Sequence, residues 1–416
     1  MSGIDAVVVG AGPAGAASAI LLAAAGWRVV LVEQHPYPRQ KVCGECLTPA
    51  GLALLHDLGV GERVLERAGP ELTHVGWMSQ RPTLIAALPP CTDGPHRYGR
   101  ALGRDTLDSL LLARAAALGV EVMQPARVRR VAAIAGGFRS DIQWTRHGRA
   151  RGAESIVHSR YVIDAHGSWE PAPAGAPAAR TAQRGSDLFG FKASFDDARL
   201  APGLLPVLSF DGGYGGIVVA ESGRLTLAGC IRRDTLQAWR AQRRSGLPAG
   251  LAMEEYLRAS CRGIRDALEG ARRRDAWLTV GPLRPGIRAT PDTGPFLVGN
   301  AAGELHPLIG EGMSMALQSA FLLTHLLTRH GAGDDGTQKA GLRRAYNHAW
   351  RQLFMPKMRV AAAYAHLAMH PAAARPAGLL LQRFPRVLTT AARWAGKSRS
   401  PTVPRGISLS LQSGTV

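Results

Sequence analysis

Residues 5–33 read DAVVVGAGPAGAASAILLAAAGWRVVLVE, and this stretch decides the fold class. The Val-rich run 5–9 predicts a strand that is covered on both faces. Three glycines follow in the spacing G-x-G-x-x-G, and residues 16–25 have a helix-forming composition. Gly26 ends that helix, and residues 27–32 predict a second strand that leads to Glu33. This order of strand, glycine turn, helix, strand and acid predicts a Rossmann-type dinucleotide-binding unit.

Each glycine of the motif has a physical role. Gly10 allows the tight turn, Gly12 lets a pyrophosphate approach the backbone, and Gly15 lets the helix pack closely on the strand. The free N–H groups at the start of the helix can hold the phosphates. Glu33 lies 18 residues after Gly15, where a carboxylate can accept hydrogen bonds from the ribose of an adenosine. It would repel a 2′-phosphate, so the motif favours FAD or NAD over NADP.

Three further segments bear on the choice between FAD and NAD. They are PYPRQKVCGECLTP at 36–49, GRDTLDSLLL at 103–112 and FLVGNAAGELHPLIGEGMSMA at 296–316. Together with the opening motif, they resemble the geranylgeranyl reductase-like branch of the FAD-dependent oxidoreductases. That branch shares its fold with aromatic hydroxylases of the p-hydroxybenzoate hydroxylase type. The resemblance implies FAD as the cofactor.

The resemblance also implies roles for the residues that match each segment. A K-x-C-G loop passes close to the flavin, the Arg of R-x-x-L-D lies near the FAD phosphates, and Val128 touches the adenine side. The strand, turn and helix of the third segment lie under the ribityl chain and the isoalloxazine ring. The expected cofactor-binding residues are Gly10, Gly12, Ala14, Gly15, Glu33, Lys41, Cys43, Gly44, Arg104, Val128, Asp164, Gly299, Asn300, Pro307, Gly310, Gly312 and Met313.

Two positions depart from the family pattern. Asn300 replaces the acid of the G-D element, and its amide can still hydrogen-bond a ribityl hydroxyl. His166 replaces the second acid of the D-A-D-G element, either as a neutral substitute, which we favour, or with a new catalytic role. Gly310 and Gly312 are expected to open a helix whose positive end can stabilise the anionic reduced flavin.

The region from about 171 to 285 lacks a second nucleotide fingerprint. Its runs LFGFKASF, GIVVAES and RLTLAGCI alternate as half-buried strands do, so they predict an antiparallel sheet that carries the substrate pocket. With a single nucleotide unit, NAD(P)H is expected to bind only transiently. Tyr214 stands where lipid-reducing relatives have a Y-x-W-x-F-P element, but no Trp or Pro follows it here, which argues against an isoprenoid substrate.

The catalytic residues are not evident from the sequence. His306, before Pro307 in the flavin segment, can act as an acid or base or merely pack there. Cys43 and Cys46 have the C-x-x-C spacing of a thiol–disulfide relay, but Cys43 also belongs to the flavin loop, and we favour that simpler interpretation. A second pair of metal ligands is missing, so no metal is expected.

Composition and charge limit the remaining classes. The chain has 416 residues, 46% of them hydrophobic, which is enough for two or more lobes. Five scattered cysteines and the lack of a leader pattern lead us to expect a cytoplasmic protein. The net charge of +19 is due mainly to arginine, and residues 329–416 hold 14 basic and 2 acidic residues. A solvated basic surface is the first interpretation, a peripheral membrane contact of this segment the second, and nucleic acid is not expected.

These observations predict an α/β fold with a discontinuous Rossmann-type FAD-binding domain, an antiparallel β substrate lobe and a C-terminal helical cap. The FAD-binding domain is expected from 1–75, 100–170 and 286–330, the lobe from 76–99 and 171–285, and a helical segment with a loose tail from 331–416. The expected function is that of an FAD-dependent oxidoreductase for a small lipophilic or aromatic metabolite, with a reductase favoured. An aromatic monooxygenase that uses NAD(P)H and O₂ is the alternative, and a noncatalytic electron-transfer flavoprotein is the alternative from another class.

Overall fold

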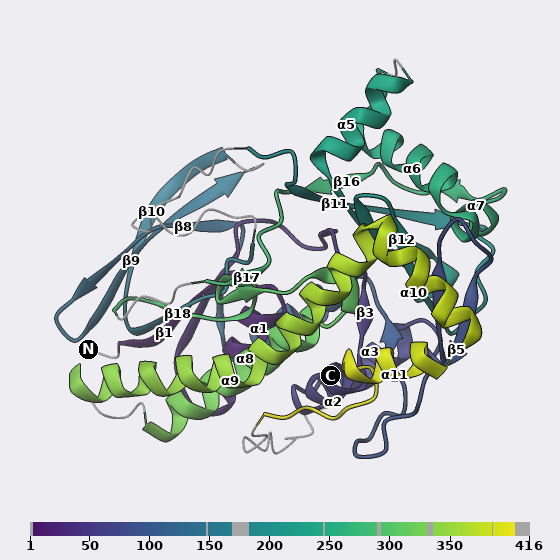
Figure 1. The fold of residues 1–416 in the computed structure, drawn as a ribbon. Helices are drawn as coiled ribbons and strands as arrows, with labels where there is room; N and C mark the ends of the chain where they lie inside the picture. Colours follow the sequence, from purple (N-terminus) through teal and green to yellow (C-terminus); the bar gives the residue numbers. More distant parts are fainter. Residues whose placement is uncertain are drawn as a thin grey trace.

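The computed structural model describes residues 3–146, 149–168, 183–243, 246–288, 293–330, 336–384 and 386–403. Two sheets form its framework (Figure 1). The first runs in the order β7-β2-β1-β10-β9-β8, and β18 also pairs with β10. Its strands are β1 Ile4–Val9, β2 Val29–Val32, β7 Glu121–Met123, β8 Ala126–Ile134, β9 Gly137–Arg146, β10 Arg149–Asp164 and β18 Phe296–Leu297.

The parallel part of the first sheet is the predicted dinucleotide-binding unit. β1 pairs in parallel with β2 and with β10, while β8 and β9 form an antiparallel hairpin beyond β10. Side chains of β1 alternate between two cores, because successive residues of a strand face opposite sides of the sheet. Ala6 and Val8 pack toward the helices, and Val7 and Val9 pack toward the hairpin.

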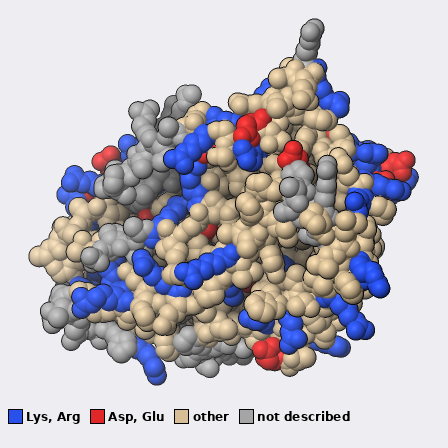
Figure 2. All heavy atoms as spheres, viewed as in Figure 1, with Lys and Arg blue, Asp and Glu red and all other residues tan. Residues whose placement is uncertain are grey.

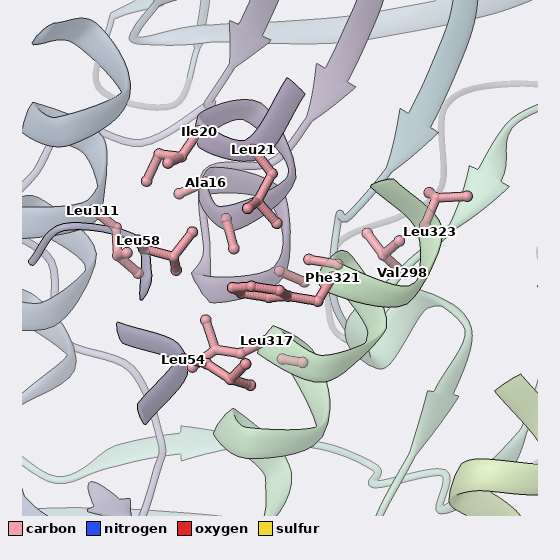
Figure 3. Packing of buried hydrophobic residues seen from close by; sticks show 14 of the residues in the cluster. Ala16, Ile20, Leu21, Leu54, Leu58, Leu111, Val298, Leu317, Phe321 and Leu323 are labelled. Carbon is pink, nitrogen blue, oxygen red and sulfur yellow. The ribbon is translucent and has the colours of Figure 1, made fainter. Parts of the chain in front are cut away.

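Helices cover one face of this sheet. The predicted helix is α1, Pro13–Ala24, and it packs against α8, Gly312–His330, and α4, Arg104–Ala117. Ala16 and Ile20 of α1 and Phe321 of α8 belong to the same core (Figure 3). The helices α2, Pro49–Asp57, and α3, Gly61–Arg67, complete this layer. Segments far apart in the sequence therefore build one domain.

The second sheet forms the predicted lobe. Its order is β15-β11-β14-β13-β12-β4-β5, with β16 paired to β11. The three strand runs predicted from the sequence are confirmed as β11, β13 and β14. One pair, β12 with β4, is parallel rather than antiparallel, because a long crossover and not a hairpin joins these strands. The strands are β4 His74–Met78, β5 Leu84–Ala87, β11 Leu188–Asp196, β12 Leu204–Phe210, β13 Gly213–Val219, β14 Leu225–Arg232, β15 Arg272–Arg273 and β16 Leu278–Val280.

Helices also belong to this lobe. α5 Arg233–Gln242, α6 Ala249–Ser260 and α7 Arg262–Ala267 bury Leu236, Met253 and Ile264 against the sheet. The short elements are β3 Cys46–Leu47, β6 Arg100–Ala101, β17 Gly286–Ile287, β19 Gly303–Glu304, η1 Glu221–Gly223, η2 Gly299–Ala301 and η3 Pro307–Ile309.

The C-terminal segment is helical. α9, Gly336–Met369, buries Tyr346, Trp350 and Phe354 in the core beside α8, so the face that carries these residues is a packing face. α10 Pro371–Arg383 and α11 Arg386–Trp394 then run back over the lobe (Figure 1). In the tail after Lys397, the Ser400 hydroxyl donates to the Asp93 carbonyl at 2.7 Å, and Val403 is buried. Residues 404–416 lie outside the described residues. Among the described helices, none is long and apolar enough to cross a membrane.

Candidate functional site

A cavity of about 580 Å³ begins at the carboxyl end of β1. There β2 and β10 leave β1 on opposite sides, which is the switch point where open α/β sheets bind ligands. The cavity continues past the 39–46 loop and the start of α8 to the second sheet, and it reaches α10 and α11. One continuous space therefore joins the nucleotide motif to the lobe.

The glycine motif forms the start of this cavity. Gly10 has φ +96°, and a Cβ on Gly15 would lie 1.8 Å from the Gly10 carbonyl oxygen, so the turn and the helix packing require both glycines. A Cβ on Gly12 would meet only Arg104 Nη2, at 3.6 Å. Side chains do not cap α1, so its first N–H groups remain for a ligand. This is the geometry in which a diphosphate can approach the backbone.

Glu33 is held in place at the end of β2. Its Oε2 accepts the Ala11 N–H at 3.0 Å, and its Oε1 accepts the His35 N–H at 3.0 Å. The side chain lines the cavity although the residue is only 4% exposed. The carboxylate is thus oriented before any ligand arrives.

We expect Glu33→Ala to weaken FAD binding, because a charged acceptor for the ribose hydroxyls is lost. The loss of hydrogen bonds to a charged group corresponds to about 1.5–3 kcal/mol, or about 10- to 150-fold in Kd. The Kd for FAD is measured by titrating the apoprotein with FAD while flavin fluorescence is monitored. Glu71→Ala removes a half-exposed carboxylate outside the cavity and is the matched control. Equal Kd values for Glu33→Ala and the wild type would contradict the role.

Cationic side chains gather beside the glycine turn. Arg39, Lys41 and Arg104 line the same part of the cavity. Arg104, the first residue of α4, is fixed by two hydrogen bonds to Asp108, from Nε at 2.8 Å and from Nη2 at 2.6 Å. Burial, and then the charges of Arg39 and Arg104, lower the pKa of Lys41 to about 8. Such a cluster of cations suits a bound diphosphate, whose charge would favour the protonated lysine.

The pKa of Lys41 predicts a pH-dependent FAD affinity. Below pH 8 the ammonium is already charged and binding is at full strength. Above pH 8 the free protein must take up a proton to bind, so Kd should rise by up to about tenfold per pH unit. In Lys41→Arg this rise should disappear, because arginine stays charged. Kd values measured from pH 7 to 9.5 test it, and a wild-type profile as flat as that of Lys41→Arg would contradict it.

The 296–316 segment contributes the opposite wall. A Cβ on Gly299, which has φ +59°, would lie 2.8 Å from the Ala14 Cβ, so this glycine allows the two nucleotide segments to meet. Gly310 ends η3 with φ +60°, and α8 begins at Gly312. The expectation that Gly310 opens the helix is therefore wrong, since its left-handed conformation belongs to a turn. A Cβ on Gly312 would meet no atom within 4 Å, so this position faces open space in the cavity.

Most of the predicted cofactor-binding residues line the cavity. Those that do are Gly10, Gly12, Ala14, Glu33, Lys41, Cys43, Gly44, Arg104, Val128, Asn300, Pro307, Gly310, Gly312 and Met313. Gly15, Gly299 and Asp164 lie behind the wall. Asp164 accepts the His166 backbone N–H at 3.1 Å and contacts its Nδ1 at 2.6 Å, which orients the His166 ring in the cavity wall. Asn300 donates to Ser168 Oγ at 2.8 Å.

The two thiols of the C-x-x-C element make separate contacts. Cys43 Sγ accepts the Glu45 N–H at 3.3 Å, and Lys397 Nζ donates to Cys46 Sγ at 3.4 Å. Both are free cysteines, and burial raises the pKa of Cys43, which disfavours the thiolate that a relay needs. Within the described part of the chain, no group of His, Cys, Asp and Glu is arranged to hold a metal ion.

A buried charge cluster behind the loop was not predicted. Glu45, with φ +57° and no exposed surface, contacts Lys192 of β11 and accepts from Thr226 Oγ1 at 2.6 Å. Arg224 Nη2 lies 3.5 Å from the same carboxylate. These contacts tie the 39–46 loop to the second sheet. The only hint in the sequence is Lys192, a lone charge within the apolar run LFGFKASF.

Tyr214 and His306 form a second unpredicted contact. The Tyr214 hydroxyl lies 3.0 Å from His306 Nδ1. Tyr214 lines the cavity, whereas His306 lies behind it between Leu305 and Pro307. Burial raises the pKa of Tyr214 well above its usual value and lowers that of His306. The pair can move a proton between the cavity wall and the half-buried imidazole.

The comparisons with known proteins agree with the fold and the cavity: the chain is an enzyme of the FAD-dependent oxidoreductase class. Residues 3–202 match the FAD binding domain family. Menaquinone reductase of Mycobacterium tuberculosis is 29% identical over 343 residues, covering 78% of this chain and 76% of that protein.

Solved structures share the fold over nearly the whole chain. The flavin-dependent brominase Bmp2 superposes with a TM-score of 0.70 at 18% identity, covering 95% of this chain and 93% of the other. A geranylgeranyl bacteriochlorophyll reductase-like protein from Thermoplasma acidophilum gives a TM-score of 0.69 at 18% identity, covering 97% and 94%. The predicted resemblance to the geranylgeranyl reductase-like branch is confirmed for the fold.

Proposed function

We propose that this enzyme is an FAD-dependent reductase of a lipophilic metabolite of the quinone class. The observation that carries the proposal is the single cavity that joins the dinucleotide motif to apolar walls. Beyond the loop it is lined by Trp77, Ile217, Tyr364, Leu381 and Leu388. Such walls stabilise an apolar substrate by excluding water from its surface. The name of the mycobacterial relative, which refers to a quinone with an apolar tail, supports the same substrate class.

The residues of the first lobe fit FAD. Glu33 would hold the ribose, and Lys41, Arg104 and the N–H groups of α1 would hold the diphosphate, while the open position at Gly312 leaves room for the ring. When bound, FAD would supply two-electron transfer between NAD(P)H and the substrate. NAD(P)H itself would bind transiently, since a second nucleotide motif is lacking in the sequence.

The side chains of the lobe would supply the proton. Reduction of a quinone takes up two electrons and two protons; NAD(P)H supplies both electrons and one proton as a hydride, so the second proton must come from the protein. Tyr214 would donate one proton from the cavity wall and would recover it from protonated His306. The Glu45–Lys192 contact would keep the 39–46 loop in place against the lobe.

Anaerobic spectroscopy distinguishes the proposed reductase from the alternative, an aromatic monooxygenase. Purified holoenzyme is reduced with NADPH or NADH and then mixed with a short-chain naphthoquinone, or with O₂ and an aromatic substrate. Reoxidation by the quinone without O₂ supports the reductase. Reoxidation that requires O₂ and yields a hydroxylated product would instead support the monooxygenase.

A further inference from the structure

Exposed apolar side chains are concentrated on α10 and α11. Leu379, Leu380, Phe384, Val387 and Trp394 are exposed to 52%, 50%, 52%, 39% and 64%. We call these five residues the C-terminal apolar patch. The other large apolar residues with comparable exposure in the described chain, Ile85, Ile134, Ile156 and Ile287, are distributed over four strands. An apolar patch of this kind on a folded surface marks an interaction site.

The inner side of the same helices forms part of the cavity. Leu381, Leu388 and Ala392 are buried against β4 and β5 and also line the cavity. Leu380 and Val387 line the cavity as well, yet both are exposed on the outside. The rim of the cavity is therefore part of the C-terminal apolar patch.

The charge around the patch has one sign. Residues 371–403 contain six Lys and Arg and no Asp or Glu. The side chains of Arg383, Arg386, Arg393 and Arg399 are exposed. In Figure 2 the face over α10 and α11 is largely uncharged, with blue side chains around it. Apolar residues bordered by arginines match the interface of an anionic bilayer, where rings and aliphatic chains enter the acyl boundary and cations meet phosphates.

We propose that the C-terminal apolar patch docks on an anionic lipid surface and that a lipophilic substrate enters the cavity there, past Leu380 and Val387. This inference rests on the proposed function for the class of substrate. A second copy of the chain fits the patch less well than an anionic bilayer does. A twofold contact would place the arginines of one patch against those of the other, with no acidic side chain between them. Docking would let the substrate pass from the bilayer to the cavity without crossing water.

Flotation of the holoenzyme with vesicles tests docking. With phosphatidylcholine vesicles that contain 30% phosphatidylglycerol, on the order of ten times more enzyme should float than with pure phosphatidylcholine. Leu379→Gln/Trp394→Gln, at positions outside the cavity wall, should lose about tenfold in binding. Ile134→Thr/Ile156→Thr removes two exposed apolar side chains from β8 and β10, at 43% and 54% exposure, and should bind like the wild type. Absence of flotation, equal binding to both lipids, or equal loss in the control pair would overturn the proposal. The proposal would also be overturned if light scattering showed that the wild type forms a dimer, that Leu379→Gln/Trp394→Gln does not, and that neither protein binds lipid.

Two substrates separate this proposal from the proposed function. Turnover of a water-soluble quinone should be the same in Leu379→Gln/Trp394→Gln and in the wild type, whereas turnover of a long-chain quinone embedded in vesicles should fall about tenfold. Flotation that depends on the patch, without reduction of either quinone, would overturn the proposed function but leave docking intact. An equal fall with both quinones would overturn entry through the patch.

Discussion

Lys192→Met is expected to destabilise the protein by about 3 kcal/mol, the lower end of the range for breaking a buried ion pair, because the buried Glu45 carboxylate loses its ammonium partner and keeps only Arg224, 3.5 Å away, as a cation. Glu45 is wholly inaccessible to solvent and Lys192 is 1% exposed, so water cannot take over the lost contact. Methionine fills a similar volume, and the loss is therefore mainly electrostatic. The free energy of unfolding of the holoenzyme, from urea titration, measures the effect.

An exposed ion pair provides the matched control. Arg199 and Glu269 are in contact at 2.6 Å with side chains 67% and 69% exposed, so Arg199→Met should change the stability by less than about 1 kcal/mol. A second variant, Glu45→Gln/Lys192→Met, removes both charges and should recover part of the loss. If Lys192→Met unfolds at the same urea concentration as the wild type, the pair does not hold the loop to the lobe.

Tyr214→Phe should lower kcat for quinone reduction by about 10²- to 10⁴-fold, since a positioned proton donor is lost. FAD content and reduction of the enzyme by NAD(P)H should stay the same, because the change lies on the lobe side of the cavity. Tyr346→Phe is the control: it removes a buried hydroxyl that donates to the Leu297 carbonyl at 2.7 Å, away from the cavity. Stopped-flow measurement of each half-reaction separates the two effects, and an unchanged oxidative half-reaction in Tyr214→Phe would refute the role.

The pH profile tests the partner of Tyr214. Burial lowers the pKa of His306 below its usual value, so the protonated imidazole is scarce at neutral pH. The rate of proton delivery should be highest below that pKa and should fall as pH rises through it. In His306→Asn this limb of the kcat profile should disappear. An identical fall of kcat with rising pH in wild type and variant would show that another group supplies the proton.

The first domain could be predicted because its signals are local. Gly10, Gly12 and Gly15 act within one turn, and the spacing to Glu33 is the length of one helix and one strand. The order of strand, turn and helix then follows from hydrogen bonding and helix packing over neighbouring residues. The family resemblance extended the same reasoning to Arg104 and to the 296–316 segment.

Contacts between distant residues could not be predicted in this way. Glu45 and Lys192 are 147 positions apart, and Tyr214 and His306 are 92 apart. Neither pair follows from propensity or periodicity, because both depend on how the two sheets pack. His306 could be named as a candidate acid or base, but its partner could not.

The sequence by itself determined the Rossmann-type unit and the strands of the lobe, since each is encoded by residue spacing within a short stretch. Only the tertiary structure decided that α9 uses its apolar face for the core, and that α10 and α11 carry exposed apolar residues over the cavity. The composition of these helices is similar, so their sequences do not distinguish a packing helix from an exposed one. The distinction arises because α8, η3 and the strands β12 and β13 pack against α9, whereas no described residue covers the apolar side chains on the outer face of α10 and α11.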